Sequence, residues 1–160
     1  MHRRLIIIRH AQTADKQAGQ RDYDRILTQE GTLQSRKTGQ QLVLNKSTPE
    51  FILCSSAVRA VNTARLLAET SGVSPSLIRP EDELYEADAG TWTQFIRQLP
   101  PRVTTAACVG HNPALSLLAS RLSQRKLDLA PAAFVIYRVN EGSWKEFDSV
   151  IEELSTQATS

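Results

Sequence analysis

An unbroken apolar run near the start of the chain, Leu5-Ile6-Ile7-Ile8, is followed directly by Arg9 and His10. The run is short, rich in β-branched residues and bounded by charge, which is typical of a strand that is buried on both faces. In α/β proteins, ligands bind at the edge of the sheet where the carboxyl ends of the strands emerge. The run therefore predicts a cation and a nucleophile at that edge.

Composition and length are those of a globular protein, and we expect 160 residues to form a single domain over 1–160, with about 150–160 as a short tail. A net charge of +2 without a run of Lys and Arg argues against nucleic-acid binding. No segment approaches the roughly 20 apolar residues of a membrane span. Cys54 and Cys108 lie in apolar segments and form no disulfide framework or metal-binding pattern, so we expect a reduced, cytoplasmic protein.

Strand and helix patterns alternate along the chain. Strands are expected at about 4–9, 51–54 and 105–109, an extended piece at 83–85, and a C-terminal hairpin from 133–139 and 143–148 that turns near Glu141-Gly142. Helices are expected at about 28–45, 57–71, 91–99 and 112–123; Thr28, Ser55-Ser56 and Asn112 are candidate caps, and Pro113 a candidate first residue. This alternation predicts a three-layer α/β/α sandwich with a mostly parallel central sheet and helices on both faces.

Two further predicted strands are also followed by an arginine or a histidine. The strand at 51–54 is followed by Arg59 in the first turn of a helix, and the strand at 105–109 by His111, also at a helix start. In a parallel sheet these ends share one edge with His10. Helix N-termini offer unpaired N–H groups, and arginine side chains offer paired donors that suit phosphate oxygens. The edge is therefore predicted to bind a phosphoryl group.

The two histidines can have different chemical roles in such a site. One imidazole must be unprotonated to attack phosphorus, and the neighbouring cations disfavour its protonated form. The other can donate a hydrogen bond to a phosphoryl oxygen. A covalent phosphohistidine would split one difficult displacement into two easier ones.

Three motifs resemble the signatures of the histidine phosphatase superfamily, which has the fold of phosphoglycerate mutases and acid phosphatases. They are Arg9-His10-Ala11, the run Ser55–Ala60 with Thr63-Ala64, and Gly110-His111-Asn112-Pro113. The first motif has Ala11 where the superfamily usually has glycine. That alanine, the compact length and the segment Asp24–Gly31 are more similar to SixA-type phosphohistidine phosphatases. The resemblance extends over about residues 4–139.

The resemblance implies roles for individual residues. His10 would be the nucleophile, Arg9 and Arg59 would bind the phosphoryl oxygens, and His111 would stabilise the transferring group. Gln12, which directly follows the motif Arg9-His10-Ala11, is either a further residue that binds phosphate or only the first residue of the loop.

The general acid of the family is implied by a separate stretch. The segment Leu84–Gly90 is similar to the Leu-x-Glu-x-x-x-Gly stretch that carries this acid in many members, which points to Glu86, with Asp88 as the alternative.

The absence of long insertions predicts an open pocket that suits a phosphoryl group displayed on a protein. By resemblance, the leading function is removal of phosphate from phosphohistidine on a partner such as a histidine-containing phosphotransfer domain. The alternatives are a small-molecule phosphomonoesterase and a non-catalytic phosphoprotein-binding module. No metal or organic cofactor is expected, because the arginines supply positive charge and a zinc site on His10 and His111 lacks a third ligand.

Overall fold

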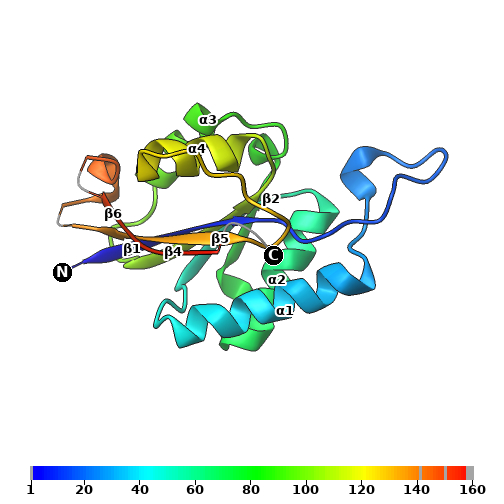
Figure 1. Cartoon of the computed structure of the whole chain (residues 1–160), viewed down its shortest axis with the longest axis horizontal. Helices are drawn as coiled ribbons and strands as arrows, with labels where there is room; N and C mark the ends of the chain where they lie inside the picture. Colours follow the sequence, from blue (N-terminus) through cyan, green and yellow to red (C-terminus); the bar gives the residue numbers. More distant parts are fainter. Residues whose placement is uncertain (1, 141, 150, 158–160) are drawn as a thin grey trace.

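A computed structural model of the chain, which describes residues 2–140, 142–149 and 151–157, has one six-stranded sheet with helices on both faces (Figure 1). Four neighbouring strands run parallel to one another, and each of the two strands added at one edge is antiparallel to the strand before it in the sheet. The predicted α/β sandwich with a mostly parallel sheet is confirmed. In spatial order the strands are β3 (Ile78–Glu81), β2 (Phe51–Ser55), β4 (Thr105–Gly110), β1 (Arg3–Arg9), β5 (Phe134–Val139) and β6 (Ile151–Gln157).

The helices form two layers, α1 (Gln29–Leu44) with α2 (Val58–Ser71) on one face of the sheet and α3 (Ala89–Arg97) with α4 (Ala114–Ser123) on the other (Figure 1). Strand β1 lies between these layers. Its side chains alternate between the two faces of the sheet. Leu5 and Ile7 pack in the core beneath α3 and α4, whereas Ile6 and Ile8 pack in the core beneath α1 and α2. Both cores therefore hold β1 in one register. None of the described helices is long and apolar enough to cross a membrane.

The helix starts follow the predicted capping chemistry in part. Thr28 caps α1, since its hydroxyl oxygen accepts from the Gly31 N–H at 2.9 Å. Helix α4 begins at Ala114 rather than at Pro113, which occupies the cap position. Asn112 still secures the first turn, because its Oδ1 accepts from the Ser116 hydroxyl at 2.7 Å.

The start of α2 differs in a way that affects the site. Its cap is Ala57, which makes no side-chain hydrogen bond, so neither serine acts as the N-cap. The Ser55 hydroxyl oxygen instead accepts from the Ala57 N–H at 3.2 Å.

The C-terminal region differs from the sequence-based prediction. The predicted second hairpin strand at 143–148 is wrong, because Trp144–Glu146 is a short 3-10 helix. Strand β5 pairs instead with β6 at Ile151–Gln157, within the range that was expected to be a short tail. Trp144 and Phe147 are both buried three residues apart, a spacing that fits a helical turn and not the alternation of a strand. Glu141, placed at the turn, lies outside the described residues.

The edge strand β3 also escaped prediction. It has only four residues, includes Pro80 and has no fully buried side chain, so it carries no apolar pattern. The extended piece expected at 83–85 is wrong, since a 3-10 helix spans Asp82–Leu84. These two elements place Tyr85 near the carboxyl ends of the strands, beside His111.

Candidate active site

His10 and His111 lie side by side because of the strand register. Strands β1 and β4 are parallel, and Arg9 pairs with Gly110, so each histidine is the next residue after a paired position. The His10 N–H donates to the Gly110 carbonyl at 2.9 Å, and the two imidazole centroids lie 5.1 Å apart. The structure thus brings the two predicted histidines together.

The His10 ring is neutral and keeps one nitrogen lone pair without a proton. Its Nδ1 lies 2.8 Å from the Ala11 carbonyl oxygen, and because a carbonyl only accepts, Nδ1 carries the proton. The lone pair is then on Nε2. Burial lowers the pKa of His10 to about 4, and the charges of Arg59 and Arg9 act in the same direction. The sequence analysis predicted the effect of the cations, but burial is the larger cause.

His111 is oriented by a serine. Ser55 Oγ lies 2.8 Å from His111 Nε2 and already accepts from the Ala57 N–H, so its own proton is free to point at Nε2. When the hydroxyl donates to Nε2, the imidazole proton lies on Nδ1, which is buried and has no partner among the described residues. Burial lowers the pKa of His111 to about 3. His111 is therefore neutral at pH 7 and has an N–H to donate.

Two arginines lie near the histidines with unused donors. Arg59 is 7% exposed, and its Nη1 and Nη2 donate to the backbone oxygen and Oδ2 of Asp22 at 2.7 and 2.9 Å. Arg9 Nη1 donates to the Leu129 carbonyl at 3.0 Å. The Nε of each arginine is buried and has no partner within the described part of the chain. Both side chains are thus fixed while each keeps an N–H for an anion.

A threonine links the first two motifs. The Ala11 N–H donates to Thr63 Oγ1 at 3.0 Å, and the Thr63 hydroxyl donates to the Arg59 carbonyl at 2.8 Å. The chain after His10 is in this way attached to the helix that carries Arg59.

Asp22 was missed in the sequence analysis, although it contacts several residues at the site. Its Oδ2 also accepts from the Tyr85 hydroxyl at 2.7 Å, and its Oδ1 accepts from Arg25 Nη1 at 3.2 Å. The Tyr85 hydrogen bond and the two arginines hold the pKa of this carboxyl well below its usual range. Asp22 begins a three-residue 3-10 helix, Asp22–Asp24, within a polar connection where no apolar pattern points to it. Tyr85 and Arg25 were missed because only tertiary folding brings them here, whereas Ser55 lies in a predicted motif and was expected only as a helix cap.

Three residues predicted for the site make no hydrogen bond with the two histidines: Gln12 and Asp88 bind elsewhere, and Glu86 is exposed. The Gln12 side-chain oxygen accepts from the Thr28 hydroxyl at 2.7 Å. Asp88 is the cap of α3 and accepts from the Thr91 N–H at 2.8 Å. Glu86 is exposed and makes no hydrogen bond or ion pair with any described residue. The roles of Gln12 in phosphate binding and of Glu86 or Asp88 as general acid stay predictions.

Comparison with protein families fits this geometry. The model of the histidine phosphatase superfamily (branch 1) matches residues 5–102, which include His10 and Arg59. The chain belongs to the histidine phosphatase superfamily. Its sequence is 37% identical over 112 residues to an uncharacterized protein of Mycobacterium tuberculosis H37Rv, covering 70% of this chain and 67% of that protein. It is 28% identical over 152 residues to an uncharacterized chloroplastic protein of Arabidopsis thaliana, covering 90% and 70%.

Solved structures share the histidine phosphatase fold. The SixA protein of Agrobacterium tumefaciens matches with a TM-score of 0.83 at 21% identity, covering 99% of both chains. The protein histidine phosphatase SixA in complex with tungstate matches at 0.81 with 21% identity, covering 97% of this chain and 96% of that one. A mycobacterial glucosyl-3-phosphoglycerate phosphatase matches at 0.68 with 19% identity over the full length of both.

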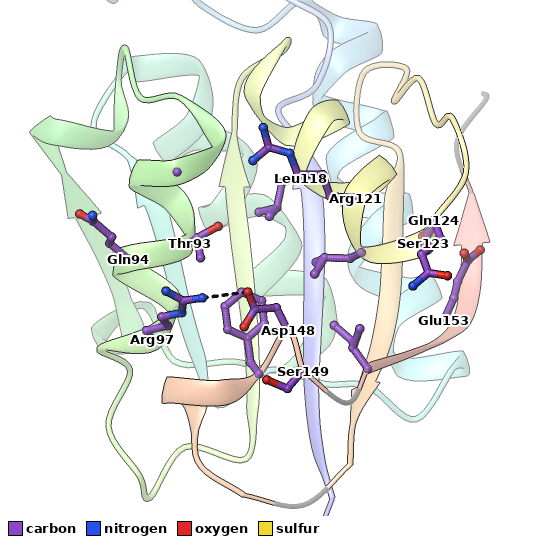
Figure 2. Close-up of a pocket in the computed structure, with 14 residues that line it drawn as sticks. Thr93, Gln94, Arg97, Leu118, Arg121, Ser123, Gln124, Asp148, Ser149 and Glu153 are labelled. Atoms are coloured by element: carbon purple, nitrogen blue, oxygen red, sulfur yellow. Dashed lines mark hydrogen bonds and ion pairs between the residues drawn. The ribbon is translucent and has the colours of Figure 1, made fainter.

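A separate cavity of about 670 Å³ lies between α3, α4 and the C-terminal residues Phe147–Ser149, Ile151 and Glu153 (Figure 2). His10, His111, Arg9 and Arg59 do not line it, and at its wall Arg97 pairs with Asp148 at 2.9 Å. It is therefore distinct from the histidine pair. No cluster of three or more His, Cys, Asp or Glu side chains that could hold a metal ion occurs in the described residues.

Proposed function

We propose that this chain is a phosphatase that transfers a phosphoryl group to His10 and then to water, and that its substrate is phosphohistidine on a partner protein. One observation carries the proposal. Two neutral imidazoles lie 5.1 Å apart, beside two arginines that each keep a buried, unpaired Nε–H. This arrangement supplies a nucleophile together with donors for phosphoryl oxygens.

In the first step, the His10 Nε2 lone pair attacks phosphorus. The bond between phosphorus and the substrate nitrogen breaks, and its electron pair goes to that nitrogen. The His10 ring then carries both a phosphoryl group on Nε2 and the proton on Nδ1, so it becomes a cation. The Ala11 carbonyl, 2.8 Å from Nδ1, stabilises that charge.

In the second step, water attacks phosphorus and the bond to Nε2 breaks. The electron pair returns to Nε2, which restores the neutral imidazole, and the water oxygen and its protons leave with inorganic phosphate. In both steps the guanidinium groups of Arg9 and Arg59 and the imidazole N–H of His111 would donate to the equatorial phosphoryl oxygens. Donors that are already oriented stabilise such charge without reorganising.

The leaving group favours phosphohistidine over a phosphate ester. An alkoxide needs a proton from a general acid, whereas a protonated imidazole leaves as a neutral molecule. Glu86, the predicted acid, is exposed and makes no polar contact with a described residue of the site. A phosphoramidate needs this acid less than an ester does, and this difference supports phosphohistidine as the substrate.

The experiment compares a phosphohistidine-bearing protein with p-nitrophenyl phosphate, with and without EDTA. It uses the wild-type chain, His10→Ala and the control His2→Ala, which removes an exposed histidine. We expect EDTA-resistant release of phosphate from phosphohistidine, faster than from the ester, and a loss of at least about 10³-fold in His10→Ala. Intact mass should detect one phosphoryl group on wild type and on His2→Ala but not on His10→Ala.

Other results would change the assignment. Faster hydrolysis of the ester would indicate a phosphomonoesterase, and inhibition by EDTA would contradict metal-independent chemistry. Phosphate binding without turnover of either substrate would indicate a binding module. Activity that survives in His10→Ala would contradict the mechanism.

A further inference from the structure

A shallow cleft of about 520 Å³ adjoins the histidine pair. It is lined by Arg21, Asp22, Tyr23, Ser56, Asp82 and Tyr85. Two of these residues join it to the proposed site: the Tyr85 ring centroid is 5.8 Å from that of His111, and Asp22 binds Arg59. The remainder of a substrate whose phosphoryl group lies on His10 can therefore occupy this cleft.

The walls of the cleft suit a flat ring. The Tyr23 and Tyr85 rings meet edge to face, with centroids 5.0 Å apart. The Arg21 guanidinium lies 5.4 Å from the Tyr23 centroid and is paired with Asp24 at 2.8 Å. The Tyr23 and Tyr85 rings are favourable neighbours of another aromatic ring or of a planar cation.

The carboxylates of the cleft differ in what they contact. Asp22 already accepts from Arg59, Arg25 and Tyr85. Asp82 is exposed, and its side chain has no hydrogen-bond or ion-pair partner in the described ranges of the chain. Asp82 is therefore the carboxylate that remains available to a ligand in the cleft.

We infer that this cleft binds the leaving group, and that Asp82 makes it selective for the protonated imidazole of phosphohistidine. The inference rests on the proposed function and adds the residue that distinguishes the leaving groups. A protonated imidazole is a planar cation that keeps part of its charge until the bond to phosphorus has broken, so Asp82 attracts it. The leaving oxygen of an ester gains negative charge, so Asp82 repels it.

The test uses two small substrates, N-phosphoimidazole and p-nitrophenyl phosphate, with Asp82→Asn and the control Glu83→Gln. Glu83 is an exposed carboxylate on the same 3-10 helix, outside the cleft lining. In Asp82→Asn we expect kcat/KM for N-phosphoimidazole to fall about fivefold, as for an exposed ion pair, and kcat/KM for the ester to rise. Glu83→Gln should behave as wild type.

The pH dependence of kcat distinguishes an electrostatic role of Asp82 from a purely structural one. Asp82 favours protonation of the bound ring, so in Asp82→Asn the alkaline fall of kcat for N-phosphoimidazole should move to lower pH by up to about 0.7 unit. Arg21, Asp22, Tyr23 and Tyr85 face the same cleft and are unchanged in both variants. Equal kinetics and pH profiles for Asp82→Asn and Glu83→Gln would overturn the inference while leaving the proposed function intact. A wild-type chain that hydrolyses neither phosphohistidine nor N-phosphoimidazole would overturn both.

Discussion

Asp22 and Arg59 lie against each other beside the proposed active site, with Asp22 Oδ2 2.9 Å from Arg59 Nη2. The Asp22 backbone oxygen accepts from Nη1 of the same guanidinium at 2.7 Å. One edge of the guanidinium is thus occupied, and Nε is the nitrogen that has no partner among the described residues. Asp22 therefore acts as a positioning residue, which fixes the direction in which Arg59 presents its remaining donors.

Asp22→Ala should lower kcat/KM about tenfold, because loss of a charged hydrogen bond costs about 1.5–3 kcal/mol and leaves Arg59 free to rotate. Steady-state kinetics on the phosphohistidine protein measures this. Asp24→Ala is the control, since within the described residues the Asp24 carboxylate pairs with the exposed Arg21 and with no other side chain. Equal or faster turnover in Asp22→Ala would mean instead that the carboxylate competes with phosphate for Arg59.

Ser55→Ala removes the hydroxyl that lies 2.8 Å from His111 Nε2. We expect kcat to fall about tenfold with a smaller change in KM, because His111 no longer holds its proton on Nδ1. Ser71→Ala is a matched control, a buried serine at the far end of α2 whose hydroxyl donates to the Leu67 carbonyl at 2.7 Å. If the two variants lose the same activity, the Ser55 hydroxyl has no special role in orienting His111.

Gly110→Ala should destabilise the fold by about 1–3 kcal/mol, since overpacking a filled core costs that much. An added Cβ would lie 2.4 Å from the Trp92 ring. Urea unfolding measures the change, with Gly90→Ala as the control, where the nearest atom to an added Cβ is 3.5 Å away. A Gly110→Ala variant as stable as Gly90→Ala would show that Trp92 can move aside without cost.

Stability should fall as the pH is lowered from about 6.5 to 4. Burial holds the pKa of His10 at about 4 and that of His111 at about 3, whereas an unfolded histidine titrates near 6.5. The unfolded chain therefore binds up to two more protons in this window, and the free energy of unfolding drops by up to about 2.7 kcal/mol per pH unit. The lowered pKa of Asp22 adds a further loss only below about pH 4, where an unfolded aspartate becomes protonated.

Urea unfolding at several pH values between 7.5 and 4.5 measures this slope. His10→Ala should reduce it, because one of the two buried imidazoles is gone, whereas His2→Ala should not change it. A wild-type slope no steeper than that of His10→Ala would contradict the assignment of His10 as a buried neutral group.

The sequence predicted the parts of the site that follow buried strands. Leu5–Ile8 identified β1, and the parallel pairing with β4 then placed His10 beside His111. Asp22 and Tyr85 could not be predicted, because they lie 63 positions apart and meet through irregular segments that have no apolar period. Strand β6 was missed for a related reason: as an edge strand it alternates only between exposed and half-buried side chains.

The alternation of β1 between the two cores has a consequence for how this protein could acquire new substrates. A shift of β1 by one residue would exchange Leu5 and Ile7 with Ile6 and Ile8, so both cores hold His10, which follows β1, in place. Asp22 and Tyr23 belong instead to the surface loop between β1 and α1. Changing Tyr23 and its neighbours while keeping Asp22, which binds Arg59, would change which molecules reach His10 and leave the two histidines and Arg59 where they are. Selectivity can therefore be redesigned in this chain separately from chemistry.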